Sequence, residues 1–380
     1  MTARERYLET MRFGHPDRIP LNPGGPREST RRVWAQQGLA DPNDWWMAFH
    51  RELGIEVEET RPKVGPGVSF RMIPEYEEKV IEHRPGTGGA PGHLVVQDWM
   101  GNVVEISDEF DVTYMRQAKD FVTRRWHKFP VENEADFEEM KKRYDLDDPA
   151  RFPDDWEDRK RAMAERDYVT TQSFSGPFWQ LREWCGFEPL CILFATEPEF
   201  VKAMISFWTD FVCKVLEKEL EGGSIDRLFI QEDMAYKAHP MISPEMTREF
   251  IAPSYRRWVE LARANDVEIV EVDSDGNVDL LVPIWIDCGM DACSPIEVAA
   301  GCDINAYRDR YGEQIAFVGG VDKRAMAKGG KIIEAELERI APVVKSGGYI
   351  PSCDHGIPSD VSWPDFLKYV KRLAELTGWL

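Results

Sequence analysis

The amino-acid sequence predicts an α/β protein, a (β/α)8 (TIM) barrel with an N-terminal antiparallel β insertion. Two observations support this fold class. From about residue 167 short apolar runs alternate with helical segments of roughly 10–20 residues, a pattern typical of parallel strands joined by helical crossovers. The chain has 380 residues, which is long enough for one large barrel.

The N-terminal part departs from this alternation. Residues 2–12 have the pattern of an amphipathic helix, and after a proline-rich break residues 19–22 are expected to form a first short strand. The stretch 66–118 is rich in β-forming residues and contains the turns GTGGAPG and Gly-Asn. We therefore predict a hairpin-rich insertion at about 66–118 within one barrel domain that covers residues 1–380.

The main body consists of repeated strand–helix units. Strands are expected at DYVTTQSF, DRLFIQ, VEIVEV, MDACS, QIAFVGG and GYIPSC, and helices at 197–221, 244–264, 277–288, 303–310, 330–345 and 363–377. Six such units and one or two near the N-terminus make a barrel of eight. A doubly wound sheet is the alternative, because it shows the same alternation.

Polar residues follow most of the predicted strands. In barrels the loops after the strands converge on one face, where active sites lie. These positions are Glu232; Asp273, Ser274 and Asp275; Glu297; Asp322, Lys323 and Arg324; and Cys353, Asp354 and His355. We expect these side chains to lie close together.

Two of these strand ends have the spacing of metal ligands. Alternate residues of an extended chain point the same way, so Asp273 and Asp275 reach one centre, as do Cys353 and His355. With Glu232 they offer oxygen, sulfur and nitrogen donors, a mixture that zinc accepts. The same groups also suit a metal-free acid/base site. A structural role is the third possibility, for example Asp275 as the cap of the next helix.

Composition excludes several classes of partner. The formal net charge of −21 argues against a nucleic-acid or anionic-membrane surface. No apolar run approaches the roughly 18 residues of a membrane span. The start has no apolar core of a signal peptide, and the seven cysteines show no CxxC spacing, so we expect reduced thiols in a cytoplasmic protein.

Several longer stretches together resemble the uroporphyrinogen decarboxylase superfamily. They are SGPFWQLREWCGFE, QEDMAYKAHPMISPEMTREFIAPSYRRW, VDSDGNVDLLVPIWIDCGMDACSPIE, IAFVGGVDKR and GGYIPSCDHGIPSDV. The superfamily also contains zinc-dependent methyltransferases that work with corrinoid proteins. The resemblance is closer to that branch, because LNPGGPREST stands where true decarboxylases have the arginine motif MRQAGR.

The resemblance implies a set of site residues. Asp273-Ser274-Asp275-Gly276 stands where the methyltransferases have His-x-Cys-Gly, and Cys353 matches their later cysteine. We expect Glu232, Asp275 and Cys353 to bind zinc, and Glu232, Asp273 and His355 to be catalytic. Substrate-binding residues are expected at Phe178, Trp179, Tyr236, Glu297, Lys323 and Arg324. A more oxygen-rich site suits the polarisation of an ether or hydroxyl oxygen.

The working hypothesis is therefore a metal-dependent methyltransferase. It would move a methyl group between a small, methoxylated substrate or acceptor and a corrinoid (cobalamin) held by a partner protein. One alternative is a metal-free decarboxylase that uses Asp and His with arginines as carboxylate clamps. The other is a non-catalytic corrinoid-binding partner, in which the barrel would be a docking platform.

Overall fold

The structure is a computed structural model that describes residues 1–58, 60–117, 122–222 and 224–380. The chain forms two compact units. Unit 1 comprises Met1–Pro66, Asp155–Gly176 and Glu219–Leu380, and unit 2 comprises Gly67–Asp154 and Pro177–Lys218. The single domain expected for residues 1–380 stays a prediction.

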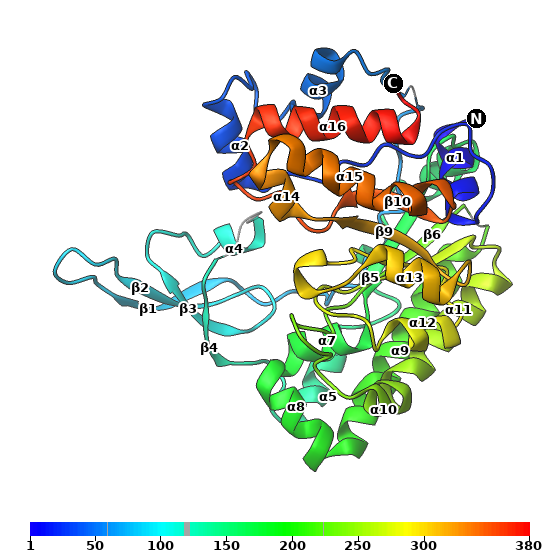
Figure 1. Ribbon diagram of the computed structural model, residues 1–380. Coiled ribbons are helices and arrows are strands. Elements are labelled where there is room, and N and C mark those ends of the chain that lie inside the picture. The colour runs from blue at the N-terminus through cyan, green and yellow to red at the C-terminus, as the bar shows by residue number, and fades with distance from the viewer. Residues whose placement is uncertain (59, 118–121, 223) are drawn as a thin grey trace. The chain divides into compact units, whose positions relative to one another are not determined.

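Unit 1 contains a six-stranded parallel sheet whose strand order is β5-β6-β7-β8-β9-β10 (Figure 1). The strands are β5 (Thr171–Ser175), β6 (Arg227–Gln231), β7 (Ile269–Asp273), β8 (Ala292–Ser294), β9 (Ala316–Val321) and β10 (Tyr349–Cys353). Each strand pairs with its neighbour in sequence, whereas a doubly wound sheet reverses its order at a switch point. The observed order is that of a (β/α)8 barrel, as predicted.

The expected strand at 19–22 is not regular in the structure. The segment PLNPGGP contains three prolines, and proline has no backbone N–H to donate to a sheet. Pro26 instead forms an isolated parallel bridge with Ile357, just beyond β10. The chain near Pro26 therefore continues the parallel arrangement beside β10 without forming a full strand.

The helices of unit 1 lie before, between and after the strands of the parallel sheet along the chain. They are α1 (Ala3–Met11), α2 (Glu28–Ala35), α3 (Trp45–Leu53), α6 (Trp156–Ala164), α10 (Pro244–Met246), α11 (Ala252–Ala264), α12 (Val282–Asp287), α13 (Ile304–Tyr311), α14 (Lys323–Lys328), α15 (Gly330–Lys345) and α16 (Trp363–Thr377). A π-turn, Thr247–Ile251, joins α10 to α11. Figure 1 shows α14, α15 and α16 beside β9 and β10. No helix in the described ranges is long and apolar enough to cross a membrane.

The N-terminal ends of the strands are closed by an apolar core. Ile269, Ala292 and Ala316 begin β7, β8 and β9, and they pack with Ile350 of β10 and with Leu8 and Met11 of α1. Burying a leucine, isoleucine or methionine side chain stabilises the fold by roughly 1.5–3 kcal/mol. Because α1 covers this end, the opposite end of the sheet is the one available for chemistry.

Unit 2 contains the predicted antiparallel sheet, in the order β1-β2-β3-β4. Its strands are β1 (Lys79–Arg84), β2 (His93–Gln97), β3 (Val103–Ser107) and β4 (Arg125–Lys128), so the sheet extends beyond the expected end at about 118. Val96, Val104, Ile106 and Met115 form its core. The helices are α4 (Tyr114–Gln117), α5 (Glu134–Lys141), α7 (Pro177–Cys185), α8 (Phe187–Thr196) and most of α9 (Pro198–Leu220).

Candidate active site

A cavity of about 320 Å³ lies in unit 1 beyond the C-terminal ends of β6, β7 and β8. It is lined by Ala235, Tyr236, Lys237, Asp275, Gly276, Glu297, Ala299, Ala300 and Arg324. Four of the predicted site residues, Tyr236, Asp275, Glu297 and Arg324, therefore share one cavity. Its volume is at the lower end of the roughly 300–1,000 Å³ typical of small-molecule sites.

Asp275 on the cavity wall is paired with His355. Asp275 follows β7, His355 follows β10, and the distance from Nε2 to Oδ2 is 3.1 Å. The hydrogen bond to Asp275 raises the pKa of His355. Asp275 does not cap the next helix, because α12 begins only at Val282, later than the expected 277. The fold thus joins a carboxylate and an imidazole that lie 80 residues apart in sequence.

Glu232 is buried beside β7. Its Oε1 accepts a hydrogen bond from the Tyr255 hydroxyl at 2.7 Å, and its backbone N donates to the carbonyl oxygen of Asp273 at 2.8 Å. A Cβ on Gly176 would come within 2.1 Å of the Glu232 carboxyl, so only glycine leaves room for this side chain. Tyr255 was not predicted as a site residue, because it lies within the helical pattern of α11.

Asp273 lies on the same face of β7 as Ile269 and Glu271, because side chains alternate along a strand. The Ser294 hydroxyl is 2.8 Å from Oε1 of Glu271 and 3.2 Å from Oδ1 of Asp273. Burial, helped by the charges of Asp275 and Glu271, raises the pKa of Asp273 to about 7. Ser294 was missed as a site residue, although it ends a predicted strand.

Cys353 points away from this group. It shares a face of β10 with Tyr349, opposite the face of Ile350 that enters the apolar core. It lies near the buried Tyr369 of α16, and a Cβ on Gly24 would approach its own Cβ to 2.8 Å. Burial raises the pKa of the Cys353 thiol to about 12, whereas metals bind the thiolate.

These positions do not fit the expected zinc site. Among the residues that the structure describes, no three His, Cys, Asp or Glu side chains form a group that could hold a metal ion. A catalytic zinc takes three protein ligands, and Asp275 with His355 supplies two. Zinc binding by Glu232, Asp275 and Cys353 is thus a prediction from the sequence that this arrangement does not support. We derive no chemical step through a metal ion.

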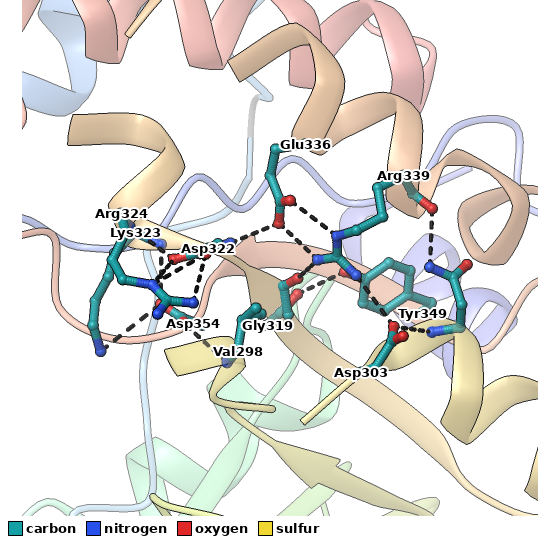
Figure 2. A network of polar contacts seen from close by, with 12 residues as sticks. Val298, Asp303, Gly319, Asp322, Lys323, Arg324, Glu336, Arg339, Tyr349 and Asp354 are labelled. Atoms are coloured by element: carbon teal, nitrogen blue, oxygen red, sulfur yellow. Dashed lines mark hydrogen bonds and ion pairs between the residues drawn. The ribbon is translucent and has the colours of Figure 1, made fainter. Parts of the chain in front are cut away.

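Glu297 and Lys323 belong to a polar network at the ends of β8, β9 and β10, part of which Figure 2 shows. Lys323 Nζ is 3.0 Å from Glu297 Oε1 and 4.0 Å from Asp354 Oδ1. Asp354 also accepts hydrogen bonds from the backbone N of Val298 and of Lys323, at 2.9 and 3.3 Å. Burial raises its pKa to about 6. Lys323 is thus engaged within the protein.

The charge of Arg324 is also balanced. Its guanidinium makes several contacts with Asp322, the shortest of them 2.9 Å long (Figure 2). The backbone N of Asp322 donates to Glu336, which in turn pairs with Arg339. Lys237, which the sequence did not single out, lines the same cavity as Arg324.

Phe178 and Trp179 lie on α7 in unit 2. Phe178 is fully buried and stacks against Phe194, with 6.4 Å between ring centroids. The Arg182 guanidinium lies 4.9 Å from the centroid of the Trp179 ring. Their expected role in substrate binding stays a prediction.

Comparison with known proteins gives a family and a fold. The model of the uroporphyrinogen decarboxylase (URO-D) family matches residues 126–375. A methyltransferase from Methanosarcina mazei has 16% identity and a TM-score of 0.58, over 100% of this chain and 98% of that one. This likeness supports the barrel fold alone.

Two further comparisons add little. A B12-independent methionine synthase from Shewanella sp. W3-18-1 has 10% identity and a TM-score of 0.39, over 58% of this chain and 65% of that one. A search of curated proteins found no match. Because the family model covers well over half of its residues, the chain belongs to the uroporphyrinogen decarboxylase (URO-D) family.

Proposed function

We propose that this protein is an enzyme that moves a methyl group between a small substrate and a corrinoid protein. Membership of the URO-D family supports an enzyme, and the resemblance of its motifs to the corrinoid-dependent branch supports methyl transfer. The observation that carries the proposal is the Asp275–His355 pair on the wall of the cavity. This pair supplies a proton where a methyl group would leave or arrive.

The chemistry needs a proton at the substrate heteroatom. When the bond between an oxygen and a methyl carbon breaks, the oxygen keeps the electron pair and its leaving is eased by protonation. The carboxyl group of Asp275 lines the cavity and gives the proton to the leaving oxygen, and His355 holds this group in place by donating its Nε2–H to Oδ2. In the reverse direction the Asp275 carboxylate takes the proton from the hydroxyl as the methyl group arrives.

The cavity is sized for the substrate and not for the corrinoid. About 320 Å³ holds a small molecule, whereas a corrin macrocycle is larger than this space. The corrinoid would stay with its own protein and reach the substrate from the cavity opening. Its cobalt supplies the other terminus of the methyl transfer.

A decarboxylase is the second candidate, and Arg27 favours it. A Cβ on Gly356 would lie 3.4 Å from Arg27 Cγ, and the Arg27 charge acts on His355. An arginine beside the acid/base pair suits a substrate carboxylate. A decarboxylase would release carbon dioxide from the substrate and would transfer no methyl group.

The test measures both products with one protein sample. Purified protein is mixed with methoxylated small molecules and a corrinoid protein, and methylation of the corrinoid and release of carbon dioxide are followed together. We expect corrinoid methylation that falls by roughly 10²–10⁴-fold in His355→Gln. The matched control Asp287→Asn, in an exposed ion pair with Arg248, should keep the rate. Carbon dioxide without methyl transfer would favour the decarboxylase, and full activity of His355→Gln would contradict the proposal.

A further inference from the structure

One cation on the cavity wall, Lys237, has no acidic partner in the part of the chain that the structure describes. Asp275 is paired with His355, and the other charged pairs at the cavity are Glu297 with Lys323 and Asp322 with Arg324. Lys237 lines the cavity and makes no ion pair within the described ranges of the chain. Lys237 is thus a cation of the lining with no carboxylate partner among the described residues, and an anionic group of a ligand would pair with it.

The turn that carries this cation is held in place. The backbone N of Tyr236 donates to the carbonyl oxygen of His239, and the backbone N of Asn277 donates to that of Tyr236, at 3.0 and 2.9 Å. Ala235 also forms a bridge with Pro240. The backbone of the turn is therefore held against the loop that follows β7.

Gly276 makes this close approach possible. Its φ is +85°, and an added Cβ would lie 2.5 Å from the backbone of Ala235. Only glycine combines that backbone conformation with that space. The turn and the loop containing Asp275 are therefore built to lie against each other.

Tyr236 adds a flat apolar surface beside the cation. It lines the cavity and is 52% exposed, although a large aromatic side chain gains free energy when it is covered. A planar ligand that packs on this ring would share the cavity with Lys237 and Asp275. The same wall thus offers a cation, an aromatic face and an acid/base group.

We propose that the cavity selects a small planar organic anion whose carboxylate binds Lys237 and whose body packs on Tyr236. This inference rests on the proposed function, because it places the reacting heteroatom of that substrate at Asp275 and His355. It differs from the sequence-based expectation in the cation that is used. Lys323, expected to bind substrate, is held by Glu297 and Asp354, and Lys237 takes that role.

The test is a binding measurement that needs no turnover. Benzoate and benzyl alcohol, which have similar shapes and differ in charge, are titrated into the full chain and followed by ligand-observed NMR. We expect benzoate to bind roughly 1.4-fold to fivefold more tightly, the range for a solvent-exposed charge pair. Lys237→Gln should remove this preference, and Lys331→Gln, an exposed lysine outside the cavity lining, should keep it.

A second pair of variants tests the aromatic face. Tyr236→Ala should weaken the binding of both probes, whereas Tyr236→Phe should bind them as the parent protein does. Equal binding of the two probes, an unchanged preference in Lys237→Gln, or no binding of either probe would overturn the inference. Binding that depends on Lys237 in a protein without methyl transfer would refute the proposed reaction and leave the ligand class standing.

Discussion

The two ends of the parallel sheet use aspartate in opposite ways. At the N-terminal end, Asp226 is fully buried and accepts hydrogen bonds from Arg4, Arg166 and the backbone of Thr170. At the C-terminal end, the Asp275 side chain is 44% exposed, and the imidazole of His355 is its partner among the described residues. Both residues lie next to a strand. They differ in how deeply they are buried and in how many hydrogen-bonding partners they have.

This difference indicates that a buried ion pair and an exposed one have different roles. A carboxylate whose oxygens all accept hydrogen bonds and that has no access to solvent cannot also contact a substrate. Its contribution is to stability. A carboxylate on a cavity wall keeps one side open, which is what proton transfer requires. We therefore expect changes at the two ends to separate stability from activity.

The largest effect should follow removal of the Asp226 carboxylate. Asp226→Ala leaves Arg166 buried without its partner, and breaking a buried pair in this way typically costs about 3–5 kcal/mol. Urea unfolding measures the loss. Asp287→Ala, in an exposed pair with Arg248, is the control and should change stability by about 0–1 kcal/mol. Equal losses in the two variants would mean that burial does not set the difference.

The next effect is on rate and concerns the Asp275–His355 pair. If the two side chains act as one unit, Asp275→Asn and His355→Gln each lower methyl transfer, and the double variant is little slower than the slower single one. Each single loss should lie at roughly 10²–10⁴-fold. Unfolding by urea should show all three variants nearly as stable as the parent. Losses that multiply in the double variant would show that the two residues act independently.

Much of the fold was predictable because it depends on local patterns. Helices expected at 330–345 and 363–377 are found as α15 (Gly330–Lys345) and α16 (Trp363–Thr377), since each has a long apolar stripe with clear ends. The expected start at 277 was wrong, because the loop after β7 packs against the turn at Tyr236 before α12 begins. That contact is tertiary and leaves no periodic signal.

The site was predictable only in part. We expected the residues that follow the strands to lie close together, because parallel strands end on the same side of a sheet. Asp275, Glu297 and Arg324 do line one cavity. The alternation rule failed to place Cys353 beside His355, since Cys353 is the last residue of β10 and His355 lies beyond it. Tyr255, Ser294 and Lys237 could not be identified, because their roles come from contacts between distant segments.

A smaller effect should follow a change in the wall of the cavity. Gly276→Ala puts a methyl group 2.5 Å from the backbone of Ala235, so the turn with Tyr236 must move. Gly289→Ala is a matched control, because its φ of +83° is similar and its nearest contact is a Val259 methyl at 3.2 Å. Both should lose about 1–2 kcal/mol of stability from the left-handed backbone. Only Gly276→Ala should also weaken benzoate binding, and an equal effect on binding in both variants would contradict this.

The smallest effect should appear in the pH dependence of stability. Burial acts to raise the pKa of Asp226, but hydrogen bonds from Arg166 and Thr170 and the charges of Arg166 and Arg4 lower it below its ordinary value of 3.8. A carboxyl with a lowered pKa in the folded state contributes stability that is complete above its unfolded pKa. This stability is lost as the pH falls through the folded pKa.

The measurement compares the parent protein with Asp226→Asn, which cannot ionise. The difference in their free energies of unfolding should be largest at about pH 7 and should shrink at about pH 3, because only the parent protein loses this contribution on protonation. A difference between parent and Asp226→Asn that stays constant with pH would show that Asp226 contributes through packing and not through its charge.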